Sequence, residues 1–170
     1  MHPYTYAHNN PYGFVDETGL DWLYVISHRM LYQVAPVERA GFDRESITSW
    51  SAALMWYRFE AWWPAVSGTR RHAPVPLGCY KLNNEIAEFL PFEWDAKKGE
   101  LYDLRPFCDS NYECWFLKIL PEFDTERTGL GMHPDGNKPG TEGCIGAKNK
   151  DCGDLLEALR KDRGPLTVVP

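Results

Sequence analysis

The chain has 170 residues, a formal net charge of −6 at pH 7, 44% hydrophobic residues and 14% aromatic residues. A chain of this size and apolar content is expected to form one domain with a proper core. The acidic balance leaves no basic surface for nucleic acid, and no apolar run approaches the roughly 20 residues of a membrane-spanning helix. We therefore expect neither a nucleic-acid partner nor a membrane span.

The first segment, residues 1–20, is polar and aromatic and is expected to be a loose arm. It has neither the basic nor the apolar region of a Sec-type signal peptide. The expectation is a protein made in the cytoplasm that either stays there or leaves by a route without a cleaved signal. Two short β-prone runs, 23–26 and 30–34, then flank a turn, which predicts a β-hairpin.

Residues 36–50 are charged and are expected to be a loop with one helical turn. Between Ala53 and Val66, apolar and aromatic residues alternate with charged ones, and a period of two favours a strand with one buried face. Helix is the rival interpretation over Ser51–Trp62, because Ala, Leu, Met and Glu are good helix formers.

The second half of the chain alternates between irregular and strongly patterned segments. Residues 83–112 have only short apolar pieces between charges, so we expect an inserted lid or hairpin there. A helix is predicted over 151–162, with Asp151 as its N-cap and one apolar face. The remaining strands are expected at Cys114–Leu120, Gly129–His133 and Leu166–Val169. The fold class is therefore mainly β with one or two helices (α+β).

The five cysteines are Cys79, Cys108, Cys114, Cys144 and Cys152. Because five is odd, at least one of them is unpaired within the chain. In an oxidising compartment the close neighbours Cys108 and Cys114 are the favoured pair. The alternative is five free thiols in a reducing cytosol.

A histidine and a cysteine, His133 and Cys144, stand on either side of ten residues that are rich in glycine and proline. Such a segment can fold back and bring an imidazole to a thiol, where it lowers the pKa of the thiol and stores its proton. A bend at Gly143 would expose the sulfur and direct main-chain N–H groups toward the oxyanion of an acyl-transfer intermediate. The alternative is an ordinary cysteine, which is often a small buried hydrophobe.

Two metal-site interpretations fail on spacing. The run that starts at Asp135 imitates a calcium loop, but Gly146 stands where the bidentate glutamate of that loop belongs. A zinc site from His133, Cys144 and Cys152 lacks the usual Cys-x-x-Cys or His-x-x-x-His spacing. We expect no metal and no cofactor.

Together these segments resemble the L,D-transpeptidase catalytic domain (the YkuD-type fold). That family carries a histidine, a variable loop, and then Ser/Thr-His-Gly-Cys followed by an aliphatic residue. The matching residues are His133, Thr141, Gly143, Cys144 and Ile145. The match extends outward, because residues 59–68 resemble the family's strand ending in Pro-Val-Ser-Thr-Gly, and residues 74–80 resemble its Thr-Pro-x-Gly-x-Tyr/Phe segment.

The resemblance covers most of residues 54–170 and implies an L,D-transpeptidase-like β-sandwich with a helix after the catalytic cysteine. Residues 51–170 would form the catalytic domain, with an insertion at about 83–112. Residues 1–50, the arm and first hairpin, would belong to the same domain.

The activity that the resemblance implies is cysteine-dependent acyl transfer on the peptidoglycan stem tetrapeptide. Cys144 would be the nucleophile, His133 the general base, and the main chain of Gly143 an oxyanion donor. The bond attacked would join diaminopimelate to the terminal D-Ala. The acceptor stays open: water gives an L,D-carboxypeptidase, a second stem amine gives a cross-link, and a free D-amino acid gives exchange.

Five residues are candidate substrate contacts: Arg127, Thr141, Glu142, Trp63 and Trp115. The guanidinium of Arg127 suits a substrate carboxylate, although a plain surface arginine is the alternative. The tryptophans suit the floor of a groove, with core packing as the alternative.

Glu142 replaces the motif's second histidine, and Gly146 replaces its Arg or Asn. The loop between His133 and Cys144 is short, and in this it resembles the corresponding loop of interbacterial effectors that are delivered by type VI secretion. This resemblance implies an antibacterial effector acting in the periplasm of a target cell, with secretion machinery and an immunity protein as partners. The alternative is a non-enzymatic phage or cell-wall-binding module on the same scaffold.

Overall fold

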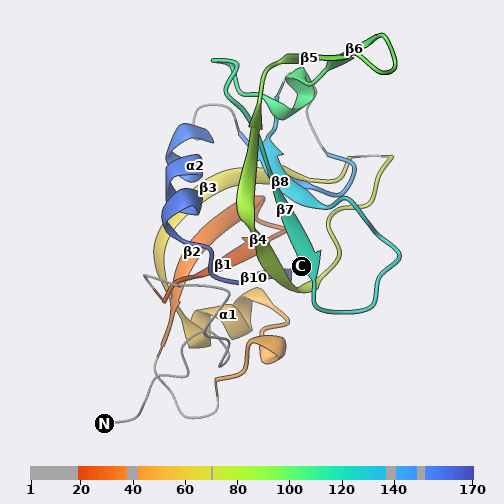
Figure 1. The fold of residues 1–170 in the computed structure, drawn as a ribbon. Helices are drawn as coiled ribbons and strands as arrows, with labels where there is room; N and C mark the ends of the chain where they lie inside the picture. Colours follow the sequence, from red (N-terminus) through yellow and green to blue (C-terminus); the bar gives the residue numbers. More distant parts are fainter. Residues whose placement is uncertain (1–18, 38–41, 70, 137–140, 149–151) are drawn as a thin grey trace.

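A computed structural model of the chain describes residues 19–37, 42–69, 71–136, 141–148 and 152–170 (Figure 1). The expected arm, residues 1–18, lies outside these described residues. The strands are β1 (Asp21–Val25), β2 (Met30–Pro36), β3 (Tyr57–Ser67), β4 (Gly78–Phe89), β5 (Phe92–Asp95), β6 (Glu100–Asp103), β7 (Cys114–Pro121), β8 (Gly131–Pro134), β9 (Ile145–Ala147) and β10 (Leu166–Val169). The helices are α1 (Trp50–Trp56) and α2 (Cys152–Lys161), with two 3₁₀ turns, η2 (Arg44–Ser46) and η3 (Arg105–Phe107).

Eight of these strands close into one barrel in the order β1-β10-β4-β7-β8-β9-β3-β2. The β1–β10 and β8–β9 pairs are parallel and the other neighbours are antiparallel. The hairpin β1–β2 is part of this barrel, because β1 pairs with β10 and β2 pairs with β3. The predicted fold class, mainly β with one or two helices and a helix after Cys144, is confirmed.

The strand β1 is buried along its whole length because it separates two hydrophobic clusters. Trp22 and Tyr24 belong to the main core, while Leu23 and Val25 belong to a second, smaller core. Successive side chains of a strand point to opposite faces, so a run of apolar residues fits a strand covered on both sides. The smaller core includes Ala53 of α1, so this helix covers one face of the strand.

Both interpretations of the segment around residues 51–66 hold in part. The helix α1 begins after Ser49, whose side-chain oxygen accepts a hydrogen bond of 3.2 Å from the N–H of Ala52, an N-cap. At Tyr57 the chain becomes extended and continues as β3, which pairs with β2 and β9. The alternating pattern therefore predicts β3, and the helix formers before it predict α1.

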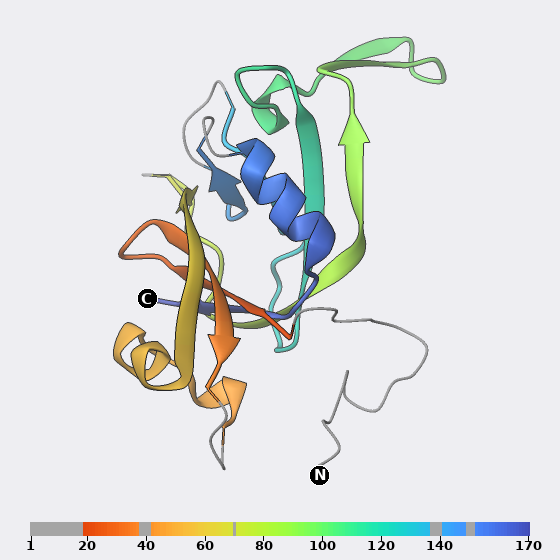
Figure 2. The ribbon, with the colours of Figure 1, turned by 90° about the vertical axis from the view of Figure 1, so that its left-hand side faces the viewer.

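The insertion predicted at 83–112 contains a hairpin, as expected. The strand β4 first continues to Phe89, and β5 and β6 then form a separate two-stranded sheet that extends beyond the barrel (Figures 1 and 2). The turn η3 follows, and a disulfide joins Cys108 to Cys114. The cysteine pair favoured by spacing is thus bonded, while Cys79, Cys144 and Cys152 are not part of a disulfide.

The helix α2 packs against the main core (Figure 2). Its buried residues are Cys152, Leu155, Leu156 and Leu159, the face that the sequence predicts. The predicted N-cap, Asp151, lies outside the described residues. Within the described part of the chain, no helix has the length and apolar character needed to cross a bilayer.

Candidate active site

The parallel pair β8–β9 brings the histidine and the cysteine of the motif together. His133 lies opposite Gly146 in the register, and Cys144 immediately precedes β9. Cys144 is therefore two register positions from the partner of His133, although ten residues separate the two in the chain. The thiol of Cys144 donates to the carbonyl oxygen of Gly129, two residues before β8, over 3.7 Å.

His133 is buried and has a defined tautomer. Its Nδ1 lies 2.7 Å from the carbonyl oxygen of Pro134. Because a carbonyl only accepts, Nδ1 must carry the proton, and the neutral ring keeps an unprotonated Nε2. Burial lowers the pKa of His133 from its ordinary value, and the bond to Pro134 opposes this shift more weakly. The imidazole is thus neutral at pH 7, as a general base must be.

Aromatic rings enclose the imidazole. Phe107 of η3 meets it edge-on with ring centres 4.9 Å apart, and Phe116 of β7 is stacked on it at 6.1 Å. Phe116 also covers Gly131, where a Cβ would overlap its ring. These contacts explain the burial of His133 and fix the plane of its ring.

Cys144 is partly buried, and burial raises the pKa of its thiol. The main chain of Gly131 and the charge of Arg127 lower this pKa, while Glu142 raises it. The expected lowering of the thiol pKa is therefore wrong, because burial dominates and the described contacts of the sulfur are with main chain. The resting pair consists of a neutral thiol and a neutral imidazole.

Gly143 is the residue that the bend before Cys144 requires. Its φ of 104° lies in the region that favours glycine, and a Cβ at this position would overlap the guanidinium of Arg127. The bend predicted from sequence is present. It turns the main chain sharply just before the sulfur, next to a fixed positive charge.

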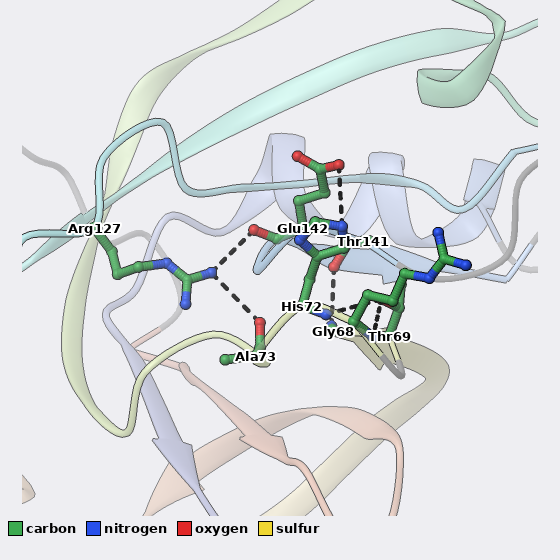
Figure 3. A network of polar contacts seen from close by, with 8 residues as sticks. Gly68, Thr69, His72, Ala73, Arg127, Thr141 and Glu142 are labelled. Carbon is green, nitrogen blue, oxygen red and sulfur yellow. Dashed lines mark hydrogen bonds and ion pairs between the residues drawn. The ribbon is translucent and has the colours of Figure 1, made fainter.

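Arg127 ties this bend to a neighbouring loop. Its Nη2 donates to the carbonyl oxygens of Glu142 at 3.0 Å and Ala73 at 3.4 Å (Figure 3). The side chain also lines an open, almost entirely apolar groove of about 580 Å³. The other lining residues are Ile26, Ser27, 73–77 and Pro170. Arg127 thus has the one charged side chain among the residues that line this groove, and it also holds the bend that precedes Cys144.

Thr141 and Glu142, the other polar residues of the motif, have different surroundings. Thr141 is buried, and its hydroxyl donates to the carbonyl oxygen of Cys144. The same hydroxyl accepts from the N–H of Gly68 at 3.2 Å (Figure 3). The Glu142 side chain is 82% exposed and lies 3.5 Å from Nε2 of His72. Thr141 therefore links the Gly143 bend to the end of β3. The Glu142 side chain lies exposed beside His72 rather than beside His133.

His72 is a residue that sequence reasoning missed. Its only signal was membership of the short basic run 69–72, which carries no spacing relation to the motif. The structure brings it next to Glu142, the residue that stands in the sequence where the resembled motif has its second histidine.

Gly146 has a steric explanation. A Cβ at this position would lie 2.9 Å from Cγ2 of Thr141 and from Cβ of Asp135. The Arg or Asn of the family motif would therefore displace the threonine that holds the bend.

The two tryptophans predicted to line a groove are core residues instead. Trp63 is 8% exposed and packs on Trp22 with ring centres 5.5 Å apart, and Trp115 is 1% exposed. Both belong to the main core, because their strands turn these positions inward. We therefore correct the groove prediction for Trp63. Trp115 borders a separate cavity of about 410 Å³ between β4, β7 and α2, which neither His133 nor Cys144 lines. The neighbouring Trp62 is 61% exposed.

Replacing Thr141 with valine is expected to loosen the Gly143 bend, because valine keeps the shape of the threonine side chain but has no hydroxyl. The N–H of Gly68 and the carbonyl oxygen of Cys144 would lose their partner, at a cost of about 1–3 kcal/mol in the free energy of unfolding. Chemical denaturation measures this loss. The exposed Thr48 is the matched control, since Thr48→Val should leave the unfolding midpoint unchanged. Equal midpoints for the two variants would contradict the assigned role of the hydroxyl.

Among the described residues, no group of three or more His, Cys, Asp or Glu side chains is placed to hold a metal ion.

Comparison with known proteins finds similarity at the level of structure only. No family model matches the sequence, and no curated protein matches it. L,D-transpeptidase 1 of Mycobacterium tuberculosis is 15% identical, with a TM-score of 0.46, over 89% of this chain and 62% of that chain. Bd1075 of Bdellovibrio bacteriovorus is 14% identical, with a TM-score of 0.48, over 88% of this chain and 47% of that chain.

An L,D-transpeptidase from Stackebrandtia nassauensis is 16% identical, with a TM-score of 0.45, over 89% of this chain and 56% of that chain. This chain thus spans less than two thirds of each of these longer chains. At such identities and TM-scores, the similarity by itself assigns neither a reaction nor a substrate.

Proposed function

We propose that this protein is a cysteine acyltransferase that acts on peptidoglycan stem peptides. The observation that carries the proposal is the defined tautomer of His133. Its Nδ1–H is held by the carbonyl oxygen of Pro134, which leaves Nε2 as a base on the strand next to Cys144. A buried imidazole that is neutral, fixed in its plane and carried on the strand next to the one that follows the thiol is suited to proton transfer.

In the proposed reaction, Nε2 of His133 takes the thiol proton as the sulfur of Cys144 attacks a substrate carbonyl carbon. The tetrahedral oxyanion is stabilised by main-chain N–H groups at the Gly143 bend. The imidazolium then gives its proton to the leaving amine as the C–N bond breaks, and a thioester remains. Water or a second amine attacks the thioester, with His133 again as the base, and restores the free thiol.

The substrate class is supported by the motif and by the groove. The motif resembles that of L,D-transpeptidases, so the acyl donor would be the stem tetrapeptide and the leaving group its terminal D-Ala. Arg127 gives the apolar groove one positive charge, which suits a short peptide with small side chains and a carboxylate. The groove does not discriminate between the three acceptors.

Incubation with purified tetrapeptide muropeptides is the direct test. Mass spectrometry is expected to find loss of one alanine, giving the tripeptide when water is the acceptor. Added D-methionine would instead appear at the fourth position if the enzyme exchanges D-amino acids, and dimers would appear if it cross-links. Folded protein that releases no D-Ala and makes none of these products would contradict the proposal.

A non-enzymatic wall-binding module is the second candidate. It is favoured by one observation, the raised pKa of Cys144 together with a thiol that donates to Gly129 rather than to His133. A module of this kind would sediment with purified cell-wall sacculi and leave the muropeptides unchanged. Its Cys144 would also react with iodoacetamide no faster than Cys144 of a His133→Ala variant.

We further propose that the activity is antibacterial, with delivery into the periplasm of a target cell by secretion machinery and neutralisation by an immunity protein. The support is the short His133–Cys144 segment, which resembles type VI effectors. Expression of the chain with an added Sec signal should lyse or arrest Escherichia coli, and expression without the signal should not. Growth that is equal in both cases would contradict an antibacterial role.

A further inference from the structure

The ring that contacts His133 edge-on comes from an element outside the catalytic motif. Phe107 is the last residue of η3, a single 3₁₀ turn in the insertion between β4 and β7. Its ring also lies 6.0 Å from that of Phe116, the second ring against the imidazole. The imidazole is therefore positioned by two phenylalanines from two separate segments.

The disulfide joins those two segments. Cys108 directly follows Phe107, and Cys114 lies two positions before Phe116 on β7. Both half-cystines are buried, at 0% and 5% exposure, and their main chains form an isolated antiparallel bridge. The bond thus fixes the spacing of the two rings that enclose His133.

The loop closed by the disulfide is itself ordered by a buried carboxylate. Asp109 is 4% exposed and accepts from the N–H of Asn111 at 2.7 Å and from that of Glu113 at 3.0 Å. On the other side, Gly136 packs so tightly that a Cβ would lie 2.5 Å from the carbonyl oxygens of Arg105 and Cys108. The turn η3 is thus held between the disulfide and the segment that leaves β8.

We propose that Phe107 is a positioning residue for His133, and that the Cys108–Cys114 disulfide holds it in place, so that the reactivity of Cys144 depends on oxidation of this pair. The inference rests on the proposed function only in treating Cys144 as the reacting thiol. Without the bond, η3 would lose its covalent link to β7 and keep only non-covalent contacts, such as those of Phe107 with Phe89 and Phe116, and the imidazole would gain room to tilt and to meet water.

The redox step is a two-electron exchange with an external thiol or disulfide. Dithiothreitol gives two electrons and two protons, becomes a cyclic disulfide, and leaves Cys108 and Cys114 as thiols. Oxidised glutathione reverses the step, taking two electrons and two protons to become two glutathione thiols. The protein would therefore be least reactive in a reducing cytosol and most reactive in an oxidising compartment.

Loss of the disulfide should also change the pKa of the His133 imidazole. The titratable and charged groups on the elements around it are Arg105 of η3, Lys118 of β7, Asp135 after β8, and Cys144 before β9. Arg105 is turned to Asp103, with hydrogen bonds of 2.8 Å. Because burial is the main cause of the lowered pKa of His133, loosening the rings should raise that pKa toward 6.5.

The test compares a Cys108→Ser/Cys114→Ser double variant with Cys79→Ser, which removes a free cysteine outside the site. Two readouts are used: the NMR titration of the His133 ring, and the iodoacetamide rate of Cys144 from pH 5 to 9, mapped by mass spectrometry. The double variant should react roughly 10- to 100-fold more slowly at pH 7, the cost of a displaced catalytic group. Its His133 midpoint should move up, and Cys79→Ser should match the wild type.

Reduction of the wild type by dithiothreitol should give the same slow rate, and oxidised glutathione should restore it. If the double variant does not fold, Phe107→Ala and Phe107→Leu test the positioning role of Phe107 with the disulfide intact. The alanine variant should slow the reaction of Cys144 with iodoacetamide, and the leucine variant should recover part of that rate. A lower melting temperature with an unchanged His133 titration and an unchanged Cys144 profile would overturn the proposal. A failure of the proposed function would look different, because muropeptides would stay intact while these thiol and NMR effects persist.

Discussion

Cys144→Ala should abolish release of D-Ala from the stem tetrapeptide, with a loss on the order of 10⁴-fold or more in kcat/KM. No other described thiol can replace this nucleophile. Cys152 is fully buried, and its thiol donates to the carbonyl oxygens of Ala147 and Lys148. Cys79 lies on β4 opposite Thr167 of β10, and therefore not on the β8–β9 pair that carries the motif. The measurement is product formation by mass spectrometry.

Cys79→Ala is the matched control for this experiment, because it also removes one free thiol and should keep full turnover. Cys144→Ser adds a sharper comparison. The serine keeps the size and the proton but is a much weaker acid than the thiol, so it should retain only a trace of activity. A Cys144→Ala protein with more than about a tenth of wild-type turnover would place the nucleophile elsewhere, since loss of a nucleophile costs orders of magnitude.

The elements that sequence predicted well are those in which local pattern and tertiary environment agree. The helix α2 has one apolar face and basic residues in its last turn, and it packs on the core through that face. The strand β7 is a short apolar run bounded by polar residues. Such segments bury the same side chains that their period places together, so neighbours along the chain contain most of the information.

The site was predictable only where the motif itself carries it. His133, Gly143 and Cys144 are recognised from spacing, and the structure places them at one bend and on one strand pair. The partner of Glu142 was not predictable, because His72 comes from a loop 70 residues earlier in the chain. Long-range contacts of this kind depend on how strands pair, which a local pattern does not encode.

Besides long-range contacts, the burial of individual side chains was not predictable from the sequence. Alternation in β3 leaves two possible inward faces, and the choice that places Trp63 in the core also leaves Trp62 exposed. The same limit explains the pKa of Cys144. A nearby imidazole suggests a lowered pKa, but the depth of the thiol is set by the folded environment, and burial raises the pKa.

His133→Gln should reduce turnover by roughly 10²- to 10⁴-fold, the usual contribution of a positioned general base. Glutamine has nearly the same size and can still donate to the carbonyl oxygen of Pro134, but its amide is no base. The matched control is His28→Gln, which changes an exposed histidine that contacts Trp50. The control should keep wild-type turnover. If both variants behaved alike, His133 would not be the base.

The pH dependence separates the base from a residue that only supports the fold. Burial lowers the pKa of His133 below 6.5, so wild-type turnover should stay high at pH 6.5 and fall only below the pKa of the buried ring, where Nε2 is protonated. Stability follows the same sign, because a folded-state pKa below the unfolded one stabilises the protein above pH 6.5 and this contribution is lost as the pH falls.

Measuring turnover together with the unfolding midpoint from pH 4 to 8 distinguishes the two roles. If His133 is the base, the wild type loses turnover at a pH where it is still folded. The His133→Gln variant then lacks this fall in turnover at acid pH, the acid limb of the profile. An acid limb that tracks unfolding in the wild type, or that persists in the glutamine variant, would assign His133 to the core and leave the thiol without its base.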